Sequence, residues 1–191
     1  MIDIKTWADG EKVTPADMKK YVSGALRGFL EPPACRRTVA NLGSQQKPGG
    51  VYQVVEFDKP GMGQGAAHSY DTTGGFMSKD PYKIYAPADG LYEISFGLIV
   101  RAVSDPLTWV VGALSKNQTD GGSIAASNFL RVGFGRATST EKVGAGSATV
   151  PLRAGDFASL AVHSEVPFLL GSGNFAQFVS HFELRWVGVK P

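Results

Sequence analysis

Hydrophobic and polar positions alternate with a period of two over most of the chain after residue 50. The clearest run covers residues 91–100, where apolar side chains occupy every second position: Tyr92, Ile94, Phe96, Leu98 and Val100. Successive side chains of a strand point to opposite faces, so this spacing predicts a half-buried strand. Shorter runs predict further strands at 51–57, 82–85, 108–115, 129–137, 148–152, 157–163 and 178–187. About eight to ten short antiparallel strands separated by turn residues predict an all-β sandwich or barrel.

A different pattern marks residues 14–30, where the sequence predicts one short α-helix. Thr14 can cap its N-terminus, Pro15 suits the first helical position, and Asp17 completes a capping box. Pro32-Pro33 ends the helix. A helix of about four turns is marginal alone in water, so its apolar stripe must dock on its own domain, in a bundle of copies, or on a partner. That stripe consists of Met18, Val22, Ala25 and Phe29.

Composition divides the chain into three parts. Residues 1–33 form an N-terminal anchoring segment, with Trp7 as the large apolar anchor ahead of the helix. Residues 34–50 are polar and rich in glycine, which predicts a linker. Residues 51–191, where the strand patterns repeat, form the head domain.

Charge and cysteine content narrow the classes of partner. The net charge is only +2 and charged residues make up 19 %, so electrostatics favours neither a nucleic acid nor a membrane surface as a partner. A single cysteine, Cys35, excludes an intrachain disulfide. The N-terminus lacks the basic and apolar regions of a signal peptide, and no apolar run approaches the roughly 20 residues of a membrane span. We therefore expect a soluble protein.

Candidate chemistry is sparse. The three histidines lie far apart in the sequence and predict no metal cluster. They are His68, His163 and His181. Three aspartates, Asp71, Asp80 and Asp89, could supply loop carboxylates to calcium, although their spacing matches no defined calcium loop. The glycine pairs lack the third glycine and the following helix of a dinucleotide loop, and no nucleophile elbow is present. We expect no enzymatic activity and no cofactor.

The ordered motifs of the head resemble those of the complement globular-head family, which are tumour-necrosis-factor-like jelly rolls. Ala86-Pro87 and Asp89–Phe96 resemble the alanine-proline-x-x-glycine-x-tyrosine entry to a central strand. Other matching segments are 70–76, 114–117, 146–156 and 180–184. Glu183 stands where the family usually has glycine, which is a departure. The resemblance covers roughly residues 51–189 and implies a jelly roll that assembles as a homotrimer and binds through surface loops.

The N-terminal segment carries a second resemblance, to the start of bacteriophage tail and fibre proteins. The match runs from Trp7 through 13–18 to 29–33, where a phenylalanine-leucine-x-x-proline-proline end follows the helix. In such proteins this segment precedes an exposed module. The combination implies an appendage of a virion assembled in the bacterial host cytoplasm.

We therefore expect a homotrimeric tail, fibre or head-attached protein of a tailed phage, with other virion proteins as partners. Alternatives are a capsid decoration protein, a tip that binds a host glycan or protein through loops 60–75, 116–128 or 164–176, and a jelly-roll enzyme such as a depolymerase. The candidate anchoring residues are Trp7, Met18, Val22, Ala25 and Phe29. The candidate aromatics of a trimer core or head core are Tyr92, Phe96, Phe182 and Trp186.

Overall fold

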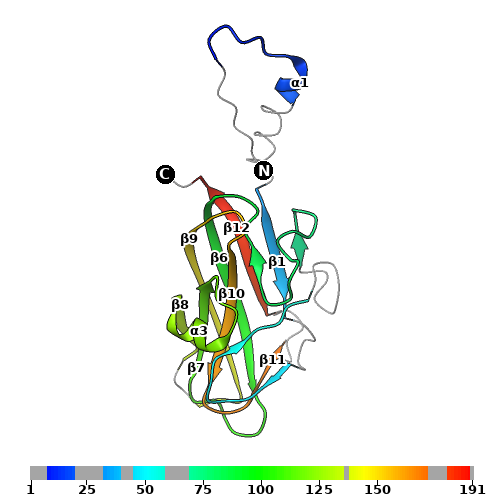
Figure 1. The fold of residues 1–191 in the computed structure, drawn as a ribbon. Helices are drawn as coiled ribbons and strands as arrows, with labels where there is room; N and C mark the ends of the chain where they lie inside the picture. The colour runs from blue at the N-terminus through cyan, green and yellow to red at the C-terminus, as the bar shows by residue number, and fades with distance from the viewer. Residues whose placement is uncertain are drawn as a thin grey trace.

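Two antiparallel sheets face each other in the computed structural model, which describes residues 8–19, 32–39, 45–58, 69–135, 138–171 and 180–189 (Figure 1). Within these residues the larger sheet has seven strands and the smaller has five. The larger contains β1 (Ala34–Thr38), β2 (Gln45–Lys47), β4 (Tyr70–Asp71), β6 (Gly90–Ala102), β9 (Glu141–Leu152), β11 (Phe168–Gly171) and β12 (His181–Gly188). The smaller contains β3 (Gln53–Val54), β5 (Ile84–Tyr85), β7 (Val110–Lys116), β8 (Asn128–Gly133) and β10 (Phe157–Ser164). These sheets confirm the predicted all-β sandwich.

Strand β6 organises the larger sheet. It pairs with β9 along its whole length on one side, and with β12 and then β11 on the other. The sheet continues from β12 to β1 and β4, and from β11 to β2. In the smaller sheet β10 pairs with β7 on one edge and with β3 and β5 on the other, while β8 borders β7. Most neighbours in space are therefore distant in sequence.

The core lies between the two sheets, as the alternation in residues 91–100 predicts. All five apolar residues of that pattern are at most 1 % exposed. Phe96 lies so close to β7 that a Cβ at Gly112 would come within 2.8 Å of its ring. Facing residues from β7 and β10, among them Leu114, Leu160 and Val162, complete the same cluster. A period of two therefore reported correctly which face of β6 is buried.

The predicted linker at 34–50 is wrong, because this segment contains β1 and β2. Strand β1 pairs with β12 from Ala34 to Thr38 and with β4 on its other edge, so it lies inside the larger sheet. Cys35 is fully buried in it. The head domain therefore begins at Ala34, not at Val51.

Arg37 explains how so polar a strand can be buried. Its side chain is 0 % exposed, and its guanidinium donates hydrogen bonds to the carbonyls of Phe57 (2.9 Å), Asp58 (2.9 Å), Lys83 (3.2 Å) and Asp80. The planar fork of an arginine can bond several carbonyls at once, which offsets the cost of removing its charge from water. Arg37 thus ties β1 to two loops of the head.

Three further elements differ from the predictions. Residues 116–128, expected as a loop, contain the helix α3 (Gly121–Ala126), capped by the side chain of Asp120. Residues 164–176, also expected as a loop, contain β11, whose Phe168 and Leu170 are fully buried. The predicted strand 148–152 begins seven residues earlier, at Glu141.

The predicted helix at 14–30 is described only at its start. Helix α1 (Pro15–Asp17) begins with the expected capping box, in which Thr14 N donates to Asp17 Oδ2 (3.0 Å) and Asp17 N donates to Thr14 Oγ1 (3.1 Å). The rest of the helix from residue 20 lies outside the described residues. In the described part of the chain, no helix is long and apolar enough to cross a membrane.

Candidate functional site

The four candidate aromatics lie in the interior of the single chain. Tyr92 and Phe182 are 0 % exposed, Phe96 is 1 % and Trp186 is 7 %. Burial raises the pKa of Tyr92 to about 12, and its hydroxyl donates to Ala88 O at 2.8 Å. Of the two roles expected for these residues, the structure places them in the head core.

Of the candidate anchoring residues, only Met18 is described, and it is 49 % exposed. The others, Trp7, Val22, Ala25 and Phe29, lie outside the described residues. Their anchoring role stays a prediction.

The aspartates considered for calcium accept hydrogen bonds from backbone amides. Asp71 accepts hydrogen bonds from Thr73 N (2.8 Å) and Ser78 N (2.9 Å), and Asp80 accepts one from Tyr82 N (2.8 Å). Among the residues that the structure describes, no three His, Cys, Asp or Glu side chains gather as a metal site would require. Burial and then the charge of Asp71 raise the pKa of the Cys35 thiol, which disfavours the reactive thiolate.

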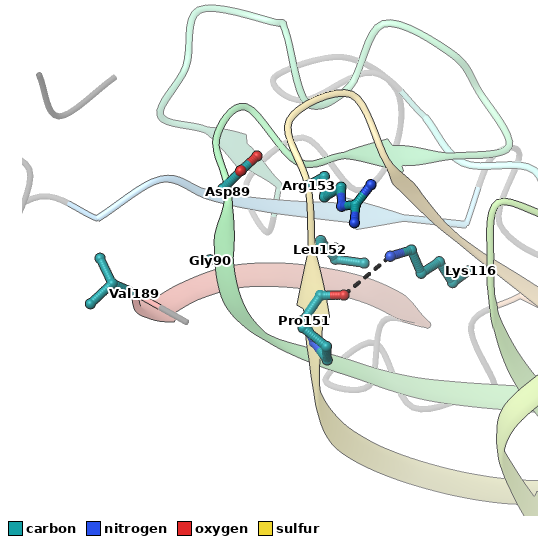
Figure 2. Close-up of a pocket in the computed structure, with 7 residues that line it drawn as sticks. All are labelled: Asp89, Gly90, Lys116, Pro151, Leu152, Arg153 and Val189. Carbon is teal, nitrogen blue, oxygen red and sulfur yellow. Dashed lines mark hydrogen bonds between the residues drawn. The ribbon is translucent and has the colours of Figure 1, made fainter. Parts of the chain in front are cut away.

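A pocket opens at the end of the sandwich where β6 begins and β9 ends (Figure 2). Its volume is about 560 Å³, and it is lined by Asp89, Gly90, Lys116, Pro151, Leu152, Arg153 and Val189. Lys116 reaches from β7 to donate to the carbonyl of Pro151 at 3.2 Å, as Figure 2 shows, and it pairs with Asp156 at 2.6 Å. The pocket thus lies where the two sheets are joined.

The carboxylates around this pocket are already engaged. Asp89 accepts a hydrogen bond from Ala154 N at 2.7 Å. Desolvation raises the pKa of Asp156, but hydrogen bonds from Asn117 and Lys116 outweigh that effect and leave the pKa at about 2. An acid–base pair needs one carboxyl with a pKa near neutrality. The geometry of these carboxylates therefore fits a structural contact between β7 and β9 better than it fits acid–base catalysis.

A second candidate surface is the outward side of β9 beyond Glu141, which we call the β9 face: Val143, Ala145, Ser147, Thr149 and Pro151. All five are exposed, Val143 by 61 %, and none carries a charge. The alternating positions, including Gly144 and Gly146, point toward the smaller sheet, where a Cβ at Gly144 would overlap the ring of Phe134. The hydrophobic pattern of the sequence does not reveal this face, because its residues are mostly small or polar and not large and apolar.

Charge lies next to the β9 face in its own sheet. Glu93 of β6 is exposed and pairs in register with Thr149, and Glu141 at the start of β9 lies 3.6 Å from Arg101 of β6. On β12, Glu183 accepts a hydrogen bond from Tyr70 Oη at 2.9 Å and lies 4.0 Å from the guanidinium of Arg36 on β1. This is the position at which the chain departs from the complement-head pattern. Cross-strand contacts of this kind stabilise the sheet.

Comparison with known proteins supports the fold. No family model matches the chain, and no curated protein does. Among solved structures 247 chains match, including the structure of Eiger TNF from S. frugiperda, with 13 % identity over 83 % of this chain and 94 % of that one and a TM-score of 0.52. The chain therefore has a tumour-necrosis-factor-like jelly-roll fold, which confirms that part of the resemblance.

Proposed function

We propose that this chain is a homotrimeric structural protein of a tailed-phage particle, in which the jelly-roll head is displayed on the surface and performs no catalysis. The β9 face carries the assembly part of the proposal. Sheet edges of free-standing proteins are usually blunted by charge, proline or a covering element. Between Glu141 and Pro151 the outward side chains of β9 are uncharged, which favours contact with another chain. A patch that contacts a different patch on the next copy closes into a ring, as a trimer requires.

The two resemblances supply the proposed number of copies and the proposed location on a phage particle. Complement-type heads assemble as trimers, and the N-terminal segment resembles that of phage tail and fibre proteins. The capping box at Thr14 supports this second point, because it starts a helix at the expected residue. Trp7, Met18, Val22, Ala25 and Phe29 then serve as the anchor to the particle or to the other copies.

The assembly is tested by the mass of the full chain in solution, measured by light scattering. We expect about three times the chain mass of 20.3 kDa. The substitution Ala145→Glu places a charge in the centre of the β9 face, where burial without a partner is costly, and should reduce the mass to that of one chain. Ala126→Glu, at an exposed position of α3, is the matched control and should leave the mass unchanged. A monomeric wild-type chain would refute the trimer.

The placement on a particle has a separate test. Immunogold labelling with antibodies against the head, on purified phage particles that encode the chain, should mark a tail, fibre or capsid site. Peptide mass spectrometry of the same particles should detect the chain. If the chain is made in infected cells but is absent from purified particles, the particle assignment is wrong even when the trimer is correct.

A further inference from the structure

The outward side of the five-stranded sheet is covered over only part of its area. Helix α3 packs Ile124, which is 0 % exposed, on Ala113 of β7 and Ala161 of β10. Figure 1 shows α3 lying against this sheet beside β8 and β7. The next row of the same face, formed by His163, Val111 and Gly133 in register, lies beyond those contacts.

Three rings gather over this next row, and we call Tyr52, Trp109 and His163 the aromatic platform. The ring centroids of Tyr52 and His163 are 5.1 Å apart, and those of Trp109 and His163 are 5.6 Å apart at an interplanar angle of 61°. Because the second contact is edge-on, it does not stack the indole, and Trp109 is 45 % exposed. The chain therefore holds a tryptophan in place without burying it.

Polar groups of both signs surround the aromatic platform. The carboxylate of Glu165 is exposed and accepts one hydrogen bond, from Thr108 Oγ1 at 3.2 Å. The guanidinium of Arg131 lies 5.6 Å from the ring of Tyr52 and donates to Ala125 O. Beside them Gly133 faces open space, since no atom lies within 4 Å of a Cβ built there.

We propose that the aromatic platform binds a neutral hexopyranose residue of a glycan, stacked on Trp109. One face of a pyranose presents C–H groups, which pack on the electron-rich face of an aromatic ring, while its hydroxyls need both donors and acceptors at the rim. Trp109 supplies the aromatic ring, Arg131 supplies donors and Glu165 supplies acceptors. Rim charges of opposite sign match an uncharged polyhydroxyl ligand better than an anion or a cation.

A sugar fits this site better than a protein partner does. A stable protein interface buries about 800 Å² on each side around a core of several apolar anchors. Within the described residues the aromatic platform offers one such anchor, the exposed Trp109, and the charged residues Arg131 and Glu165 lie beside the platform. The site also lies on the opposite sheet from the β9 face, so trimer formation leaves it open. The inference requires only the fold, not the particle.

The test uses the full chain and a printed array of oligosaccharides that end in galactose, glucose, mannose or N-acetylglucosamine, followed by titration of the matching methyl glycosides. We expect binding of at least one terminal sugar, with a Kd of about 1 mM. Trp109→Ala should weaken that binding at least tenfold, whereas Trp109→Phe retains a ring and should keep most of it. Tyr82→Ala, which removes an aromatic side chain that is 39 % exposed elsewhere, is the matched control.

Two results would overturn the inference. One is no binding to any of the four sugars by the wild-type chain. The other is binding that Trp109→Ala leaves intact, which would place the sugar elsewhere. Light scattering of Trp109→Ala should give the wild-type mass, so failure of the sugar site and failure of the trimer are read separately.

Discussion

The outward faces of the two sheets differ in how far the chain itself covers them. On the five-stranded sheet the chain covers part of the face itself, with Ile124 of α3 on Ala113 and Ala161. On the seven-stranded sheet the five residues of the β9 face are exposed and uncharged. A face that its own chain covers serves the stability of the fold, whereas an uncharged face left open is available to a second copy.

Strand β9 shows the same division within one strand. Its outward residues carry side chains of ordinary size, while Gly144 and Gly146 face inward and allow close approach by β8. Packing therefore constrains one side of the strand, and under our proposal contact with another copy constrains the other. Substitutions on the two sides should separate these roles.

The largest effect should come from charge placed under α3. Ala161→Glu puts a carboxylate at a position that is 0 % exposed, with an apolar neighbour in Ile124. Burial of an unpaired charge should lower the free energy of unfolding by about 3 kcal/mol or more, seen as a fall in Tm of about 10 °C by differential scanning calorimetry. Ala126→Glu, exposed on the same helix, should change stability by less than about 0.5 kcal/mol. Equal Tm values for the two variants would mean that α3 does not cover the sheet.

An intermediate effect should come from the inward side of β9. Gly144→Val forces a branched side chain into the space of the Phe134 ring and should cost about 2 kcal/mol of stability through overpacking. Thr149→Val on the β9 face keeps the shape of the side chain in an exposed position and should be nearly neutral. Urea denaturation of both variants measures their free energies of unfolding. A larger loss of stability in Thr149→Val than in Gly144→Val would contradict the prediction.

The smallest effect concerns the joint between the two sheets at the pocket. The folded pKa of Asp156 is about 2, below the roughly 3.9 of an unfolded aspartate, so its ionised form stabilises the fold above pH 4 and this contribution is lost as the pH falls toward 2. Asp156→Asn should therefore lower stability by about 1 kcal/mol at pH 7 and by almost nothing at pH 2. Thermal melts of the wild type and Asp156→Asn between pH 2 and pH 7 check this prediction. A stability difference that stays constant over this pH range would contradict it.

Part of the fold could be predicted because some signals are local. The alternation from Tyr92 to Val100 reports a buried face within ten residues, and Thr14 with Asp17 forms a capping box within one turn. The predicted strands 148–152 and 157–163 leave only four residues between them, and Asp156 N donates to Arg153 O at 3.0 Å in the turn that joins them. These features depend on neighbours in the sequence. The two candidate surfaces depend on distant parts of the chain. The sequence of β9 does not show that its outward residues stay uncovered, and the aromatic platform combines residues from β10 and two loops.

The sequence by itself determined which residues alternate, where the helix starts, and that the head is an all-β domain, because period, caps and turns act between residues a few positions apart. Only the tertiary structure decided that Ala34–Thr38 forms an internal strand. Its two arginines interrupt the apolar pattern of a buried strand, so the sequence does not predict it. The strand is buried because β12 and β4 pair with it and because the Arg37 guanidinium donates to four carbonyls. The tertiary structure also decided which side of each sheet stays open. Burial of a sheet face depends on what packs against it from a distant part of the chain, and no short stretch of sequence carries that information.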